Sequence, residues 1–322
     1  MAEIAPPAPV RPEHLTVTRI PDPAEPVPSI SRPGTGLLLG GLALWWGSTI
    51  AYTQGVWPWP VSTALNAIAS YVLFTVAHDA SHHSLSTHPR VNDLFGRVAT
   101  AFFAPHAGFR TWRFIHMQHH RFTNHEDGSD PDHYTNRGPG WQAPLRWLTI
   151  DLWYMVFYLP KLPSRPRGEQ VELLATWTVI FGASAAVIVT GHLGELIVLY
   201  YLPVRIAVMF LGFAFDYLPH HGLHGTPSQD RLKTTRNRVG AERVISPLLL
   251  FQNYHLVHHL HPRVPFHRYL AVWWRNEEAY LQGGPALSTV RGRPITVDEY
   301  RRMRELDGHG RGPAAPARSA EV

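Results

Sequence analysis

The sequence predicts an all-α integral membrane protein, with four transmembrane helices in two hairpins under a cytoplasmic helical cap that holds a di-metal site. Two observations predict this fold. Three histidine clusters and a fourth short histidine segment have spacings that place several imidazoles on one helix face. In addition, four apolar stretches have roughly the ~20 residues needed to cross ~30 Å of hydrocarbon, and they cover residues 35–54, 58–78, 171–190 and 193–215.

The two ends of the chain differ from this apolar part. Residues 1–33 contain nine prolines and no sustained apolar periodicity, which predicts a disordered or extended tail. The small residues of 306–322 predict a second disordered tail. The membrane domain is therefore expected over residues 34–305.

Positive charge predicts the orientation of the spans. Neither turn between spans, at 55–58 and at 190–195, contains a lysine or arginine, whereas the tail, residues 79–170 and the chain after 220 contain nearly all of them. By the positive-inside rule these three segments are cytoplasmic, so both termini and all histidine clusters lie on the cytoplasmic face of a plasma or inner membrane. Arg205 is the exception within a span. It either pairs with Glu195 or borders a substrate channel.

The segments between the spans complete the cap. Residues 91–112 predict an amphipathic helix, or a pair of helices, in the membrane interface. Residues 144–160 are apolar but short, and a full span there would separate the histidines, so this stretch is also predicted to be interfacial. Residues 161–170 and 222–243 are predicted to be polar loops.

The histidines predict two metal ions rather than one. The chain has no cysteine, which excludes disulfides, thiolate ligands, iron–sulfur clusters and cysteine nucleophiles, so a metal must use nitrogen and oxygen ligands. Structural zinc takes four ligands, fewer than are available here. Several transition metals accept imidazole, and a thiolate-free, mostly neutral set favours a pair of irons. The nine candidate ligands are His78, His82, His116, His119, His120, His220, His255, His258 and His259, with His83 as a rival to His82.

Four stretches resemble the membrane fatty-acid desaturase/hydroxylase superfamily over roughly residues 35–275, and within it the β-carotene 3-hydroxylase branch. They are HDASHHS (78–84), HMQHHRFTNHEDGSDPDHY (116–134), FDYLPHH (215–221) and QNYHLVHHLHPRVPFHRY (252–269). The resemblance implies a di-iron site held by the nine histidines, O₂ as co-substrate and an external electron donor. It also implies that Asp216 holds a metal-bound water. Residues 222–243 depart from the shorter linker of the family.

Three further residues are predicted to support the ligands. Asp130 and Asp132 would orient ligand imidazoles by accepting their second N–H, with a plain Asp-Pro turn as the alternative. Asn253, two residues before His255, is expected to cap the helix of the third cluster.

The predicted function is an oxygenase that hydroxylates the ring of β-carotene to zeaxanthin-type products. A fatty-acyl desaturase or lipid hydroxylase with the same metal chemistry is the alternative. A non-catalytic metal transporter or sensor is a remote third, because transporters place ionisable ligands near mid-membrane. No nucleic-acid partner is expected.

The electron donor is expected to be a separate protein, such as a ferredoxin with its reductase. The chain lacks cysteine and a Gly-rich dinucleotide fingerprint after a strand. An acidic donor would dock on a basic cytoplasmic face, although the same charges could instead anchor the cap to anionic lipid headgroups. These residues are Arg231, Lys233, Arg236, Arg238, Arg243, Arg263 and Arg268.

Overall fold

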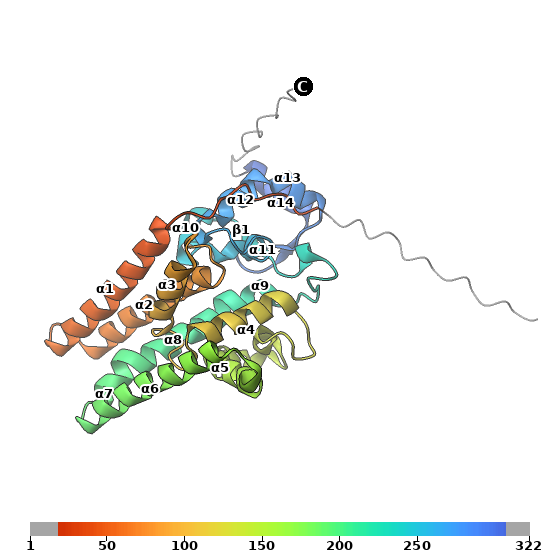
Figure 1. Ribbon diagram of the computed structural model, residues 1–322. Coiled ribbons are helices and arrows are strands. Elements are labelled where there is room, and N and C mark those ends of the chain that lie inside the picture. The colour runs from red at the N-terminus through yellow and green to blue at the C-terminus, as the bar shows by residue number, and fades with distance from the viewer. Residues whose placement is uncertain (1–18, 307–322) are drawn as a thin grey trace, which may run out of the picture.

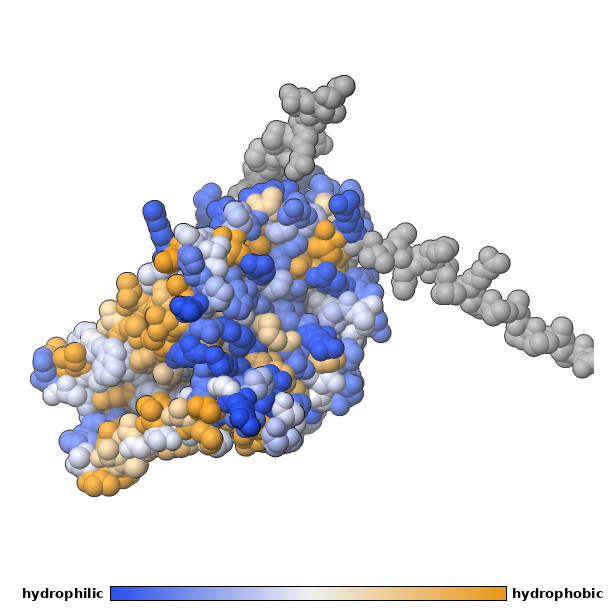
Figure 2. Space-filling view, in the orientation of Figure 1, coloured by the Kyte–Doolittle hydropathy of each residue, from blue (hydrophilic) through white to orange (hydrophobic). Residues whose placement is uncertain are grey.

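The computed structural model describes residues 19–306 as a bundle of long helices joined to a cap of short elements (Figure 1). The two outermost stretches, 1–18 and 307–322, lie outside the described residues, and with them most of the two predicted tails. Figure 2 shows hydrophobic residues gathered over the bundle and mostly hydrophilic ones over the cap. The long helices are α1 (Arg32–Thr53), α2 (Trp59–Ser81), α6 (Arg167–Val189) and a composite helix from Leu193 to His220.

Three of these helices are long and apolar enough to cross a membrane: α2, α6 and the composite helix. The first predicted span, 35–54, forms α1, but α1 does not join this set. Its many glycine, serine, threonine and tryptophan residues lower its hydropathy. The prediction of four spans is therefore supported for three of them. α1 nevertheless lies along α2, and Ser48 and Ser62 bond reciprocally to each other's backbone carbonyl at 3.2 and 3.1 Å.

The composite helix contains two widened, π-helical turns. It runs through α7 (Leu193–Leu196), η4 (Ile197–Tyr201), α8 (Leu202–Leu211), η5 (Gly212–Tyr217) and α9 (Leu218–His220), where η4 and η5 are the π-helical turns. Each widened turn precedes a proline, Pro203 or Pro219, whose ring cannot donate an N–H and crowds the carbonyl four residues earlier. The carbonyl of Leu199, which Pro203 cannot bond, instead accepts from Asn66 Nδ2 at 2.8 Å.

Two helices cover the segment 91–112, in line with the predicted pair. α3 covers Pro89–Thr100 and α4 covers Phe109–Phe122, so α4 extends ten residues beyond the predicted end and carries the second histidine cluster. α5 (Ala143–Tyr158) has 16 residues, fewer than a span requires. The predicted loop 161–170 is wrong at both ends. η3 (Leu159–Ser164) fills its start, and α6 begins at Arg167.

Arg205 does not pair with Glu195, which instead lies 3.7 Å from His192. The Arg205 guanidinium reaches α5 instead. It donates to Asp151 Oδ1 at 2.7 Å, to the second Asp151 oxygen, and to the Leu148 carbonyl at 2.8 Å. The arginine is therefore neutralised inside the bundle by a carboxylate on another helix.

A small sheet and short helices form the cap. β1 (Asn237–Val239) pairs in parallel with β2 (Leu287–Thr289), and β2 pairs antiparallel with β3 (Pro294–Ile295). β1 lies inside the predicted polar loop 222–243, so the expectation of a purely helical fold is wrong here. The helices are α10 (Glu242–Leu248), α11 (His255–Leu260), α12 (Tyr269–Arg275), α13 (Glu277–Gln282) and α14 (Val297–Leu306), with short 3₁₀ turns at Asp132–Asn136, Gly140–Gln142, Arg231–Lys233, Gln252–Tyr254 and Phe266–Arg268.

Residues 19–31 form an extended strap over the cap. Glu25 bonds to Arg268 at 2.7 Å and to Arg275 at 3.2 Å, and Ser31 N donates to the Leu85 carbonyl at 2.7 Å. Of the two predicted alternatives for this tail, the extended one describes residues 19–31, and the predicted boundary at residue 33 is two residues late because α1 begins at Arg32.

Candidate metal centre

All nine predicted ligand histidines meet at the junction of bundle and cap. α2 carries His78, and His82 follows its last residue; α4, α9 and α11 carry the others. Their ring nitrogens form two groups in which all the atoms lie within 4.8 Å of one another. The first group is His78, His82, His116 and His258; the second is His119, His220, His255 and His259; His120 lies with His258 and His259 between them.

The Nε2 atoms of these histidines point toward one another. His82 and His116 face each other at 2.8 Å, and His258 Nε2 lies 3.0 Å from that of His78 and 2.9 Å from that of His120. Nitrogens bound ~2.1 Å from one ion lie roughly 3 Å apart. His220 Nε2 is buried with no hydrogen-bond partner among the described residues. The donor set therefore fits two ions with nitrogen ligands.

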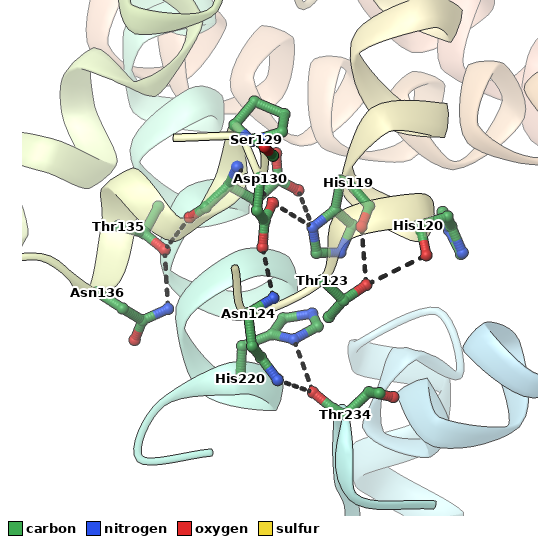
Figure 3. Close-up of polar contacts among 12 residues, drawn as sticks. His119, His120, Thr123, Asn124, Ser129, Asp130, Thr135, Asn136, His220 and Thr234 are labelled. Atoms are coloured by element: carbon green, nitrogen blue, oxygen red, sulfur yellow. Dashed lines mark hydrogen bonds and ion pairs between the residues drawn. The ribbon is translucent and has the colours of Figure 1, made fainter. Parts of the chain in front are cut away.

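Asp130 and Asp132 hold His119 from its other side. His119 Nδ1 lies 2.9 Å from Asp130 Oδ1 and 3.3 Å from Asp132 Oδ2. Figure 3 shows Asp130 directed at His119 with one oxygen and at the backbone N–H of Asn124, 2.8 Å away, with the other. This arrangement fixes the ring rotation and leaves Nε2 free to face the second group.

Other ligand candidates are held in the same way, mostly by residues that the sequence analysis missed. Gln252 and Tyr269 belong to a quoted stretch, but their spacing gave no sign of which imidazole they touch, and Thr234 contributes only its backbone. The contacts at Nδ1 are Gln252 Oε1 to His255 at 2.8 Å, Tyr269 Oη to His258 at 2.9 Å and the Thr234 carbonyl to His220 at 3.3 Å.

Burial keeps most of these imidazoles neutral, which is the form that binds a metal. It lowers the pKa of each of six histidines well below the usual value, and neighbouring histidines and arginines lower it further. His119 differs, because Asp132 and Asp130 outweigh its burial and raise its pKa to about 9. The six are His82, His116, His120, His255, His258 and His259.

A chain of hydrogen bonds leads away from His119 toward a cavity lined by Asp132, Tyr154 and Asp216. Tyr154 Oη donates to Asp132 Oδ1 at 2.7 Å, and Asp132 also shares a hydrogen bond with Asp216. Burial raises the pKa of Asp132 to about 6, against the lowering effect of His119. Asp216 lies on the widened turn η5, one turn before His220, and lines the same cavity as Asp132 and Tyr154.

That cavity adjoins both histidine groups. It has a volume of about 50 Å³, and aromatic and aliphatic side chains form most of its wall. Its apolar residues include Phe74, Phe103, Trp112, Ile150 and Phe215; its polar ones include His78, His116, His119, Asp132, Asp151, Asp216 and His255.

Two residues predicted near the site have other positions. His83 has a left-handed backbone, with φ of 55°, and lies outside both groups, whereas its rival His82 lies inside the first. Asn253 does not cap α11; its Nδ2 donates to the Arg238 carbonyl at 3.2 Å. Asn237 of β1 takes the capping role, because its Oδ1 accepts from Leu256 N at 3.0 Å. The strand that supplies this cap lies in a segment predicted to be a loop.

Comparisons with known proteins identify the family of this chain. The family model for fatty acid desaturases matches residues 54–291. A beta-carotene ketolase of Paracoccus sp. (strain N81106 / MBIC 01143) is 28% identical over 218 residues, which cover 66% of this chain and 76% of the relative.

Two plant desaturases are similarly related. The acyl-lipid omega-3 desaturase (cytochrome b5) of the Arabidopsis thaliana endoplasmic reticulum is 26% identical over 251 residues, 66% of this chain and 62% of the relative. The chloroplastic temperature-sensitive sn-2 acyl-lipid omega-3 desaturase (ferredoxin) of the same plant is 24% identical over 261 residues, 67% of this chain and 55% of the relative. The match therefore spans less than two thirds of either desaturase.

The family match bears on three earlier predictions. It confirms the predicted superfamily and indicates an oxygen-dependent oxidoreductase, which does not favour the non-catalytic transporter. With the three apolar helices it also indicates an integral membrane protein. The match covers 238 residues, well over half of the chain, so this protein belongs to the fatty acid desaturase family.

Proposed function

We propose that the chain is a membrane di-iron oxygenase that uses O₂ and external electrons to insert a hydroxyl group into a ring C–H bond of a carotenoid. β-Carotene is the proposed substrate, with zeaxanthin-type products. The observation that carries this proposal is the pair of four-histidine groups beside a cavity with a mostly apolar wall. A relative named as a beta-carotene ketolase supports a carotenoid as the substrate class.

The ligands are proposed to be the nine histidines, with one ion at each group and His120 between them. Two irons held there would supply the reduction of O₂ and the cleavage of an unactivated C–H bond. The protein's own contribution is orientation, because Asp130, Gln252 and Tyr269 hold imidazoles by Nδ1. The aromatic wall of Phe74, Trp112 and Phe215 excludes water from the reacting carbon.

Protons consumed with O₂ must reach the site from outside this wall. Tyr154, Asp132 and Asp216 form a connected hydrogen-bonded set at the cavity. Asp132, with a pKa raised to about 6, can hold and release a proton near neutral pH. We assign these three residues to proton delivery, with Asp216 proposed as the residue that passes the proton into the cavity.

A ketone is the second candidate product. Two successive hydroxylations of one ring CH₂ give a geminal diol, which loses water to form a carbonyl group. The relative named as a ketolase favours this outcome at the same site. The two relatives named as acyl-lipid desaturases keep fatty-acyl oxidation as a third.

We further propose that both termini and the cap face the cytoplasm, on the plasma or inner membrane. A separate redox protein would supply the electrons there. The names of the two plant relatives include ferredoxin and cytochrome b5, which supports a small external donor. The basic charge of the cap suits an acidic donor, and ferredoxin with its reductase is the donor proposed here.

The experiment is expression in a host that makes β-carotene, with pigments and lipids both profiled by mass spectrometry. A His259→Ala variant, which removes one ligand of the second group, serves as the control. Hydroxylated carotenoid that disappears with His259→Ala supports the proposal, and ketocarotenoid supports the second candidate. Unchanged β-carotene together with a newly oxidised acyl lipid would overturn the carotenoid assignment.

A further inference from the structure

A large apolar groove lies between α2 and the composite helix, outside the histidine cavity. Its volume is about 750 Å³, compared with about 50 Å³ for the cavity. Among residues 19–306, no charged side chain lines it. Its two hydroxyl groups are already engaged, since Thr63 donates to the Val198 carbonyl at 2.6 Å and Tyr71 to the Leu248 carbonyl at 3.0 Å. The groove therefore suits a hydrocarbon chain rather than a polar headgroup.

The length and exposure of the groove indicate an extended ligand from the bilayer. Its lining on α2 runs from Trp59 to Val72, which spans about 20 Å at ~1.5 Å per residue. Ile68 is 52% exposed and Ile206 44%, on two helices with the length and hydropathy of membrane spans. Figure 1 shows α2 and α8 running side by side toward the cap. A chain entering this groove would come directly from the lipid.

Three aromatic side chains in contact lead from the groove to the cavity. The Tyr71 ring lines the groove and lies 5.8 Å from the Phe215 ring. Phe215 lies 4.8 Å from Phe74, and Phe74 lies 5.9 Å from the imidazole of His78. Phe74, Phe215 and His78 all line the cavity. The three aromatic rings thus form a continuous partition of side chains between the groove and the candidate metal ligand His78.

The cavity is too small for a lipid chain in its present form. A volume of about 50 Å³ admits a few water molecules at ~10–15 Å³ each. We propose that the groove binds the long apolar chain of the substrate. Tyr71, Phe74 and Phe215 would turn aside to admit its reacting end. This proposal rests on the proposed function in one respect: the molecule in the groove is taken to be the substrate of the histidine site.

A second hollow offers a competing route that the structure favours less. It lies between α3 and α6, has a volume of about 280 Å³, and shares Ala104 with the cavity. The shared residue Ala104 lies in the connection between α3 and α4, so opening this route requires a change in the main chain rather than in side chains alone. An ion pair also lines this hollow, with Arg97 Nε 2.9 Å from Glu172 Oε2. A hydrocarbon chain would have to pass these charges.

Photolabelling tests the route without relying on turnover. The probe is an octadecyl chain with a diazirine at one end, added to the iron-loaded protein in lipid nanodiscs, with adducts mapped by mass spectrometry. We expect adducts on groove residues of α2 and α8, reduced about tenfold by Ile206→Trp, which fills the groove. Val179→Trp, which fills the second hollow instead, should not reduce them. Adducts mainly at Val179 or Ile180, or undiminished labelling of Ile206→Trp, would overturn the proposal.

The partition has its own test. Tyr71→Ala should raise adducts at the cavity residue Leu211 several-fold, whereas Tyr71→Phe, which keeps the ring, should not. Iron content measured on the same samples shows that each variant is folded. Equal labelling of Leu211 in both variants would disprove the partition. If the probe labels the groove but the protein oxidises no carotenoid, the proposed function is overturned and the groove proposal stands.

Discussion

Tyr269 and His258 are in contact inside the cap, with Tyr269 Oη 2.9 Å from His258 Nδ1 and both residues shielded from solvent. The other ring nitrogen of His258 faces His78 at 3.0 Å and His120 at 2.9 Å. A residue outside the histidine clusters thus sets the ring rotation of the most central ligand candidate.

Tyr269→Phe should weaken iron binding while the fold is kept. The phenol is the partner of the second nitrogen of His258, and loss of such a partner typically costs about 10–100-fold in affinity. Iron retained after dialysis against graded chelator measures the effect. Tyr52→Phe, at the far end of α1, is the control. Equal iron retention in the two variants would contradict the role assigned to Tyr269.

Replacing a ligand should be more severe than replacing its support. His258→Ala is expected to abolish product formation and lower bound iron, because His258 is fully buried and lies in the first group and beside His120. His88→Ala, at an exposed position before α3, should do neither. Asp132→Ala should be intermediate. Full activity after His258→Ala would refute the ligand set.

Iron affinity should rise with pH. The pKa of His119 is raised to about 9 in the metal-free protein, so at neutral pH an ion binding through its Nε2 must displace a proton. Affinity should therefore increase by up to about tenfold per pH unit until pH reaches ~9, and then level off. Asp132→Asn removes one of the two carboxylates that raise the pKa of His119, so the plateau in iron affinity should begin at lower pH. Anaerobic chelator competition between pH 7 and 9 provides the measurement, and a flat profile would contradict it.

The Arg205–Asp151 pair should stabilise the bundle as a unit. Asp151→Leu leaves the guanidinium without its carboxylate. For a fully buried pair this lowers the free energy of unfolding by ~3–5 kcal/mol. Here we expect a loss of about 2 kcal/mol, because the Arg205 side chain is 30% exposed. The double variant Asp151→Leu with Arg205→Met should recover most of this loss. Thermal unfolding midpoints in detergent decide the matter. A double variant no more stable than the single one would show that the pair does not act as a unit.

Three of the seven basic residues predicted to form the docking face are at least partly buried and engaged within the protein. Arg236 is only 8% exposed and bonds to the His221 carbonyl, Arg238 bonds to the Leu218 carbonyl, and Arg268 bonds to Glu25. These side chains hold the cap together. The basic side chains of this set that are exposed to solvent are Arg231, Lys233, Arg243 and Arg263, although Lys233 Nζ also lies 3.1 Å from Asp230 Oδ2.

Charge reversal should therefore be made at exposed positions. Lys233→Glu with Arg263→Glu should raise the apparent KM for ferredoxin several-fold at unchanged iron content, and the wild-type rate should fall as salt rises. Arg301→Glu, on the exposed surface of α14, is a matched control. Salt-insensitive turnover in detergent, where lipid charge is absent, would rule out electrostatic docking.

The sequence predicts which residues gather better than it predicts how they are held. Histidine spacing on helices is local, so HxxxH and HxxHH patterns identify eight of the nine candidates, and His220 comes from the separate FDYLPHH segment. Positions such as Thr234 and Asn237 reach the site only through β1, which pairs with β2 some 50 residues later. Non-local pairing of this kind leaves no periodic signal in a three-residue strand.

The bundle shows a similar limit. Length and hydropathy located the long helices to within a few residues at most ends, but not the partner of Arg205. Glu195 is the nearer acid along the chain, yet the composite helix turns it away, and Asp151 of α5 is nearer in space. The widened turns before Pro203 and Pro219 were also unforeseen, although each proline marks its place.

The contact between His78 and His258 joins residues 180 positions apart, in a chain with no cysteine. An ion bound between them would act as this protein's cross-link, closing a loop that contains most of the membrane domain. Such a link restricts the unfolded chain, as a disulfide does. Iron supply during synthesis would then determine how much folded protein a cell accumulates, in addition to how much of it is active.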